Sequence, residues 1–386
     1  MITIQNAENA LKSVYLGAIT ELLNTKANPL LTKIEQTGAD VWGKEIRKAV
    51  SFGISGGIGA GDEDGELPSS GAKKYLQMIT TLKNLFGQIE ISDKAIRASA
   101  DGRGAFTDLL NAELQSLLDS SKFNLGRMLY GTSSGVLCTV GAKSGASYPV
   151  SKTNALIEGM IVDVYGSSGT LSASGVRLAS VDRAQNTITF ESEPASAVTA
   201  SSKMYVQGSK GKEITGLGDV FAATGSIYGL SRSAYPFLAP YTKSDVGPID
   251  DIVIQRAIDS LENNANSEVD FIACAADVKY AYQDYLSQFK RNVDIMELEG
   301  GYKTLSFNGI PLVYERFVDN GVMYLLNTKS MKLHQLCDWR FLETENGKIL
   351  RQNQGRATYA ATLVKYCDLI CDRPNGLGRL SGITAE

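Results

Sequence analysis

The sequence has one histidine, two tryptophans and no apolar run as long as a membrane-spanning helix. With His334 as the only imidazole, a Ser-His-Asp or Cys-His mechanism, or a metal site built from several histidines, must involve that one position. Residues 1–17 also lack the basic region followed by an apolar stretch that a secretory signal carries. Most hydrolase classes are therefore disfavoured, and we expect a protein that is made and kept in a cytoplasm.

A strong charge of either sign is missing as well. Lys and Arg total 38, Asp and Glu total 42, and the net charge of −4 leaves no basic footprint of the kind that nucleic-acid-binding proteins carry. The five cysteines are an odd and scattered set, which argues against a disulfide framework. By contrast, 386 residues with 43% hydrophobic content suffice for two or three domains, each with its own core.

Apolar periodicity divides the first half of the chain. Helical spacing predicts a helical arm within residues 1–50, interrupted by Pro29, and a long amphipathic helix over 101–131. The apolar stripe of this helix consists of Phe106, Leu109, Leu110, Leu114, Leu117, Leu118, Leu125 and Met128. Between them, alternating residues near 50–55 and 87–92 predict the two sides of a long hairpin. Residues 131–215 are rich in Ser, Gly, Thr and Val, with short alternating runs such as the two joined by the turn residues Asp182, Gln185 and Asn186. This pattern is typical of a small all-β module.

The remaining chain indicates an α/β region. Residues 249–261 predict a helix, at whose start Asp250 and Asp251 are more simply interpreted as helix-start charges than as a catalytic acid pair. Residues 277–290 predict a second helix with Asp277 as its N-cap.

Strands are predicted around these helices. Residues 269–275 have the composition of a short buried strand. Residues 309–318 and 321–328 are expected to pair with each other as a hairpin across the turn Asp319-Asn320-Gly321.

Two motifs suggest chemistry but have simpler interpretations. The glycines of residues 56–61 resemble a phosphate-binding loop, yet acidic residues follow them instead of a helix start or a Lys-Ser/Thr pair. His334 and Cys337, with Cys367 and Cys371, suggest a zinc site. In strands, however, residues three apart point to opposite faces, and the apolar neighbours favour buried thiols. The sequence therefore assigns no catalytic, cofactor-binding or metal-binding residue.

The ordered set of elements resembles the major capsid proteins of tailed bacteriophages, which have the Hong Kong 97-type fold. Residues 49–75 resemble the extended loop of that family, 105–131 its spine helix, and 271–336 its axial domain. Residues 356–383 resemble its last peripheral strand and return to the axial domain. The likeness spans nearly the whole chain outside 138–222, which resemble the β insertion of some members.

The resemblance implies an α+β chain with the Hong Kong 97-type fold and an all-β insertion domain. It divides the chain into an N-terminal arm (1–50), an extended-loop hairpin (51–92), a spine helix with part of the peripheral domain (93–137), a β-rich insertion (138–222), an axial domain (223–336), peripheral strands (337–370) and a return to the axial domain (371–386).

The implied function is that of a self-assembling structural subunit of an icosahedral phage head, in hexamers and pentamers of one chain around double-stranded DNA. The resemblance implies no enzymatic activity, no cofactor, no metal and no membrane, and only non-specific contact with DNA. Because the arm begins near Met1, a separate scaffolding protein is expected, with a portal protein and, as in some relatives, decoration proteins. The protein would lie in the virion after assembly in the host bacterial cytoplasm. Two alternatives remain open: an encapsulin-type compartment shell, and a carbohydrate-binding or enzymatic module that uses the β insertion.

The glycine-rich loop is the expected site of contact between subunits. Glycine gives a loop the backbone freedom to close many slightly different contacts, and ordering it costs about 1–2 kcal/mol per residue, so a neighbour must supply its contacts. The expected contact residues are Gly56, Gly57, Gly59, Gly61, Asp62, Glu63, Asp64 and Glu66 on the loop, with Arg47, Lys48, Arg97 and Arg103 as cations on the adjacent subunit. Lys73 and Lys74 also leave open a cross-link to a neighbour's asparagine, as in some relatives.

Overall fold

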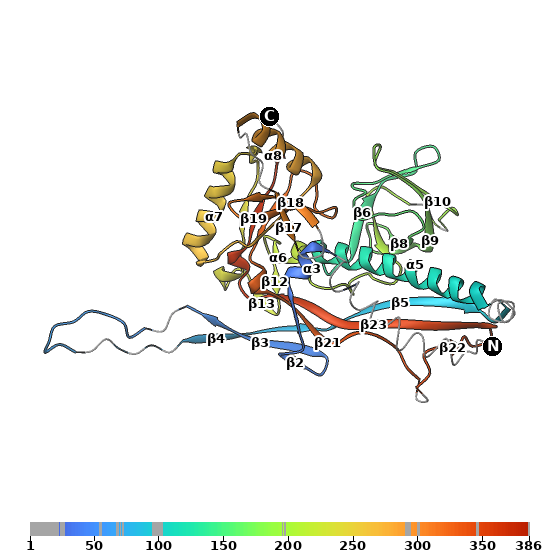
Figure 1. The fold of residues 1–386 in the computed structure, drawn as a ribbon, viewed down its shortest axis with the longest axis horizontal. Helices are drawn as coiled ribbons and strands as arrows, with labels where there is room; N and C mark the ends of the chain where they lie inside the picture. Colours follow the sequence, from blue (N-terminus) through green and yellow to red (C-terminus); the bar gives the residue numbers. More distant parts are fainter. Residues whose placement is uncertain are drawn as a thin grey trace.

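The computed structural model describes residues 23, 28–53, 56–66, 69, 71, 73–94, 103–194, 196, 198–289, 295–298, 302–344 and 347–384. Long strands run along the length of the molecule, and two separate bodies stand on one side of them (Figure 1). Helices and strands alternate without a regular βαβ repeat, so the predicted α+β class is confirmed.

The long strands form a sheet in the order β1-β21-β23-β22, with β5 also paired to β23. Their bounds are β1 Glu35–Thr37, β5 Lys83–Ser92, β21 Met331–Phe341, β22 Arg351–Gln352 and β23 Thr358–Cys371. β5 is antiparallel to β23 along its whole length. Leu85, Ile89 and Ile91 of β5 are buried while the residues between them are more exposed, as expected of a strand with one face on the core.

A three-stranded sheet, in the order β2-β3-β4, continues the long sheet as a projecting hairpin (Figure 1). Its strands are β2 Val41–Trp42, β3 Glu45–Phe52 and β4 Lys74–Thr81. β3 and β4 are antiparallel from Glu45 opposite Thr81 to Phe52 opposite Lys74, and the single residue Leu82 separates β4 from β5. A long hairpin is confirmed, and the described residues of 53–73 form its tip. Its return side is β4, and the predicted side at 87–92 is wrong, because these residues lie in β5 and pair with β23.

The predicted amphipathic helix is α5, Arg103–Tyr130, which lies along the long sheet (Figure 1). Its buried stripe includes Leu114, Leu117, Leu118, Leu125 and Met128, as the helical spacing predicts. The other stripe residues, Phe106, Leu109 and Leu110, lie outside the side chains that the structure describes. A methyl group on Gly87 of β5 would lie 2.7 Å from Cδ1 of Leu117, so the helix packs closely on the strand at this glycine.

One of the two bodies is built on a seven-stranded sheet in the order β14-β24-β20-β16-β19-β18-β17. The bounds are β14 Tyr241–Lys243, β16 Phe271–Cys274, β17 Ile295–Leu298, β18 Tyr302–Phe307, β19 Ile310–Tyr314, β20 Met323–Leu326 and β24 Gly378–Leu380, with helices α7 Asp251–Ala265 and α8 Ala276–Phe289. Asp250 caps α7 by accepting a hydrogen bond from the backbone N–H of Val253 at 2.6 Å. The interpretation of this acid as a helix-start charge is confirmed.

The predicted hairpin between β19 and β20 is wrong. Both strands pair with β16, β19 in parallel and β20 antiparallel, so β16 lies between them. All residues of β16 and β20 are buried, and a fully buried strand takes a partner on each edge. The chain between β19 and β20 instead passes the end of β16, where the Glu315 N–H donates to the Cys274 carbonyl and the Ala275 N–H donates to the Val322 carbonyl.

One local prediction at a helix end also needs correction. Asp277 lies inside the first turn of α8, after its first residue Ala276, so it is not the N-cap. Its carboxylate accepts the backbone N–H of Gly321 at 2.7 Å and so joins the start of α8 to the turn at 319–321. Pro29 is the first residue of the short helix α3, Pro29–Lys33, a position at which a proline has no N–H bond to lose.

The second body is a six-stranded sheet in the order β6-β11-β8-β9-β10-β7. The bounds are β6 Val136–Val140, β7 Tyr148–Pro149, β8 Ile161–Tyr165, β9 Leu171–Asp182, β10 Thr187–Phe190 and β11 Ser202–Val206. Its buried side chains, from Leu137 to Met204, form a cluster separate from the main core. β9 and β10 pair across the turn at 183–186, so the predicted hairpin there is confirmed.

Short elements connect these parts. They are α6 Leu217–Val220, β12 Ser226–Ile227, β13 Leu230–Ser231, η2 Pro236–Leu238, β15 Gly247–Pro248, η3 Thr328–Ser330, η4 Pro374–Gly376 and β25 Ile383–Thr384. The seven domain ranges expected from the sequence stay predictions. The proposed boundaries at 50/51, 336/337 and 370/371 fall inside β3, β21 and β23, respectively. Of the helical arm predicted within residues 1–50, the part before residue 23 lies outside the described residues. Between residues 35 and 50 the prediction of helix is wrong, because the chain there forms strands β1, β2 and β3.

Gly216 provides a test of how closely α5 packs against the connector that follows the β insertion. A methyl group at this position would lie 2.5 Å from the carbonyl oxygen of Gly131 and closer still to that of Met128. Because backbone would have to move, we expect Gly216→Ala to destabilise the chain by about 1–3 kcal/mol in chemical denaturation. Gly61→Ala is the matched control, since no atom lies within 4 Å of its added methyl, and it should change stability by less than about 0.5 kcal/mol. Equal denaturation midpoints for the two variants would contradict this account.

Candidate inter-subunit surfaces

The tip of the β3–β4 hairpin is exposed throughout its described residues. Every residue of 56–66 is exposed, and Ile58 retains 94% of its accessible surface. The tip has a turn in which the Gly65 N–H donates to the Asp62 carbonyl, and Gly57 has a φ of 94°, a conformation that favours glycine. At its base the two sides meet closely, because a methyl on Gly71 would lie 2.9 Å from the Gly56 nitrogen. Two glycines thus lie at positions that favour glycine: Gly57 has a positive φ, and Gly71 lies close to the backbone of Gly56.

The acids of the tip have no ion-pair partner among the residues that the structure describes. Asp62, Glu63, Asp64 and Glu66 are exposed, and none of them forms an ion pair with another residue that the structure describes. No helix follows the glycines within the described part of 53–73, so the helix N-terminus that a phosphate loop requires is missing there.

The cations predicted to meet these acids have different surroundings. Arg47 pairs with Glu45 on its own strand at 2.8 Å, and both side chains are exposed. Lys48 pairs with Asp372 at 2.9 Å, and these side chains keep only 14% and 24% of their exposure. Arg103 is the first residue of α5. Its side chain and the whole of Arg97 lie outside the part of the chain that the structure describes. Lys48 is therefore already engaged inside the subunit.

The residues suggested as a zinc site lie in the long sheet, where His334 of β21 is opposite Asp368 of β23. His334 is fully buried, its Nδ1 lies 2.8 Å from the Ala39 carbonyl, and burial lowers the pKa of its imidazole. Burial raises the pKa of the Cys367 and Cys371 thiols to about 12, so both are protonated at neutral pH. In the part of the chain described, no three His, Cys, Asp or Glu side chains are grouped to hold a metal ion.

Asp368 joins three separate segments and was not singled out from the sequence. Its carboxylate accepts hydrogen bonds from the Thr80 hydroxyl at 2.7 Å and from the backbone N–H and hydroxyl of Thr215 at 2.7 and 3.2 Å. Thr80 belongs to the hairpin strand β4, and Thr215 to the connector after the β insertion. Burial raises the pKa of this carboxyl group. The base of the projecting hairpin is thus fixed to the sheet by a buried polar cluster.

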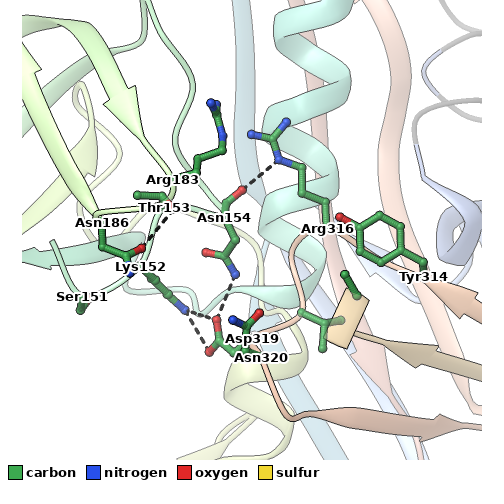
Figure 2. Close-up of a pocket in the computed structure, with 12 residues that line it drawn as sticks. Ser151, Lys152, Thr153, Asn154, Arg183, Asn186, Tyr314, Arg316, Asp319 and Asn320 are labelled. Atoms are coloured by element: carbon green, nitrogen blue, oxygen red, sulfur yellow. Dashed lines mark hydrogen bonds and ion pairs between the residues drawn. The ribbon is translucent and has the colours of Figure 1, made fainter. Parts of the chain in front are cut away.

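A cavity of about 720 Å³ lies between the two bodies (Figure 2). Lys152 and Asn154 of the β insertion both reach Asp319, with N–O distances of 2.9 and 3.0 Å. Arg316 donates to the carbonyl oxygens of Asn154 and Leu156 at 3.2 and 3.1 Å. Side chains and backbone of one short segment therefore hold the insertion against the axial body.

No helix among the described residues is both long and apolar enough to cross a membrane. No family model and no curated protein matches the sequence. Among solved structures, the chain is similar to the capsid asymmetric unit of cyanophage A-1(L), with a TM-score of 0.54 and 13% identity over 96% of this chain and 93% of that chain.

Two further solved structures have lower scores. The capsid of an empty GTA particle has a TM-score of 0.48 and 10% identity over 93% of this chain and 90% of that chain. The holo-SrpI encapsulin complex from Synechococcus elongatus PCC 7942 has a TM-score of 0.46 and 11% identity over 91% and 85%. The fold assignment rests on the cyanophage structure alone. The chain has the Hong Kong 97-type fold of phage capsid proteins, with a projecting hairpin, a spine helix, a peripheral sheet, an axial body and a β insertion, as the sequence predicts.

Proposed function

We propose that the chain is a major capsid protein, the structural subunit of the shell of a tailed-phage head that encloses double-stranded DNA. The observation that carries this proposal is the projecting hairpin tip, which is exposed and whose four acids have no ion-pair partner among the described residues. Such a segment gains contacts only from another molecule, and in a closed shell that molecule is a second copy of this chain. The fold shared with a cyanophage capsid chain supports the same reading.

The tip would act by lying on the adjacent subunit. Its proposed contact residues are the glycines Gly56, Gly57, Gly59 and Gly61 and the acids Asp62, Glu63, Asp64 and Glu66. Each exposed ion pair contributes about 0–1 kcal/mol, so the shell would draw its stability from the sum over many copies, and wrong contacts would dissolve. Arg47, Arg97 and Arg103 remain proposed cationic partners, while Lys48 would first have to leave Asp372.

The remaining parts of the proposal concern partners and location. The net charge of −4 suits a wall that contacts packaged DNA only non-specifically, because a basic wall would bind the phosphates tightly. We propose separate scaffolding and portal proteins, assembly in the host bacterial cytoplasm, and no enzymatic role. A role for Lys73 or Lys74 in a cross-link between subunits stays an open proposal, and both residues are exposed.

Electron microscopy of the purified chain, alone and with a scaffolding protein of its phage, tests the proposal. We expect uniform closed hollow particles with five-fold and six-fold clusters of subunits. Monomers that persist under both conditions, together with saturable binding of a sugar or turnover of a small molecule, would instead favour a module that acts through the β insertion. Packaged DNA separates a phage head from an encapsulin-type compartment, whose particles would contain protein cargo.

A further inference from the structure

Five consecutive residues, Glu315 to Asp319, touch three other parts of the chain, and we name this segment the strap. At its first residue the strap holds the N-terminal arm. Nδ2 of Asn28 donates to Oε2 of Glu315 at 2.6 Å, while Oδ1 of the same asparagine accepts the Leu30 N–H and so caps α3. Both Asn28 and Glu315 are buried. Both Nδ2 and Oδ1 of Asn28 are therefore hydrogen-bonded, and this side chain joins the N-terminal arm to Glu315.

At its middle the strap packs on the spine helix. The rings of Phe317 and Phe123 meet edge to face, with centroids 5.2 Å apart. A methyl on Gly126 would lie 2.7 Å from the Phe317 ring, so the helix is in close contact with the strap at this glycine. The Arg316 guanidinium lies over the Phe123 ring at 4.9 Å. The strap cannot shift without changing its packing on α5.

The β insertion is held by the same segment. Arg316 donates to two carbonyl oxygens, those of Asn154 and Leu156. Asp319 accepts hydrogen bonds from Lys152 and Asn154, and Figure 2 shows these contacts together with the one between Arg316 and Asn154. Because Arg316 follows Glu315 directly in the chain, a displacement of one moves the other. The arm and the insertion are thus connected through about four peptide units.

Glu315 is a buried carboxyl group, and no described residue forms an ion pair with it. The neighbouring cation, Arg316, directs its guanidinium to the carbonyl oxygens of the insertion. The other titratable groups around Glu315 are Tyr130 of α5, Tyr314 beside it, and Cys274 and Tyr324 further along the same cluster. Burial is the main cause that raises the pKa of Glu315 to about 7, against smaller opposing effects of the Asn28 and backbone hydrogen bonds. The hydroxyl of Tyr130 is buried and has no hydrogen-bond partner among the residues that the structure describes.

We propose that the strap couples the N-terminal arm to the β insertion, so that undocking the arm also loosens the insertion, and that a negative charge on Glu315 favours the undocked state. The coupling is physical, because both partners are bonded to adjacent residues of one packed segment. Undocking exposes the carboxylate to water, which relieves the cost of a buried charge. The inference depends on contacts within one chain and not on shell formation.

The sign of the pH effect follows from linkage. The docked state holds Glu315 with a pKa of about 7, and undocking returns it toward the ordinary value of 4.5. The docked state therefore binds more protons, and the undocked fraction rises as pH increases from about 4.5 to about 7 and then levels off. Between pH 5 and pH 8 we expect the opening equilibrium to increase on the order of tenfold to a hundredfold.

Hydrogen exchange of the purified full chain, corrected for the intrinsic effect of pH on exchange, tests this inference. In the wild type, amides of residues 29–37 and of 151–156 should lose protection together between pH 5 and pH 8. Glu315→Gln should remove the pH dependence from both segments. Glu268→Gln, at an exposed ion pair with Lys329 on the axial body, is the matched control and should keep the wild-type profile.

A second variant tests the coupling from the other end. Lys152→Met removes the ion pair with Asp319 and should lower the protection of residues 29–37 as well as that of the insertion, because coupling between two sites is reciprocal. If the arm and insertion amides respond independently in both variants, the coupling is wrong. If Glu315→Gln keeps the wild-type pH profile, the role assigned to the carboxyl group is wrong. Neither result depends on whether the wild type forms shells.

Discussion

A chain that lacks residues 56–70 is expected to fold and to form no closed shells. The deletion joins Ser55 to Gly71, a short gap because Gly71 already lies close to Gly56, the next residue after Ser55. The ladder between β3 and β4 ends at the pair Phe52 and Lys74, outside the deleted stretch, so the hairpin and its attachment to the long sheet remain. The variant loses the exposed tip of the projecting hairpin. Circular dichroism should match the wild type, while electron microscopy should show no closed particles.

A matched variant separates the length of the tip from its charge. Replacing Asp62, Glu63, Asp64 and Glu66 with their amides keeps the reach of the loop and removes four negative charges. If the acids contribute through exposed pairs, this variant should assemble more weakly, and its assembly should depend less on salt concentration than that of the wild type. Normal particles from the deletion variant would refute the assignment of the tip as an inter-subunit contact.

The second large effect is expected at a buried ion pair that joins the spine helix to the connector after the β insertion. Arg127 and Glu213 are 4% and 1% exposed, and the guanidinium donates to both carboxylate oxygens at 2.9 and 2.6 Å. Asn124 accepts a further hydrogen bond from Arg127 at 2.6 Å. Arg127→Met leaves Glu213 buried without its partner, and we expect a loss of about 3–5 kcal/mol in the free energy of unfolding.

The double variant Arg127→Met, Glu213→Leu is the control for this prediction. Without a stranded charge, apolar side chains of similar size should restore most of the stability, so the double variant should be more stable than either single one. Chemical denaturation of the three variants and the wild type completes the cycle. A double variant that loses as much as the sum of the two single variants would mean that the pair is not coupled.

Periodicity in the sequence predicts the elements that have one exposed face. The stripe of α5, the alternation at 87–92 in β5 and the turn between β9 and β10 each follow from local spacing, because one side of every such element meets water. The glycines of the tip are equally local, since backbone conformation is set by neighbours in the chain.

Pairing between buried strands is where local spacing fails. β16 and β20 are apolar at every position, so no alternation indicates which strand lies beside which, and the strong turn signal at Asp319–Gly321 favoured the wrong partner. The strap and Asp368 were missed for a related reason. A single buried Glu or Asp has the same appearance in sequence as an exposed one, and only the fold brings Asn28 to Glu315 and Thr80 to Asp368.

The pairing of strands from opposite regions of the chain has a consequence for synthesis. β1 pairs with β21, β5 pairs with β23, and β20 pairs with β24 along one edge. Until β21 and β23 have been translated, the backbone N–H and C=O groups at the edges of β1 and β5 lack these partner strands in the nascent polypeptide. The peripheral sheet is complete only when β23 has emerged at residues 358–371, and the axial sheet only when β24 has emerged at residues 378–380. A truncated translation product would consequently present open sheet edges, which are sites for aggregation and for chaperone binding, instead of a subunit fit for incorporation.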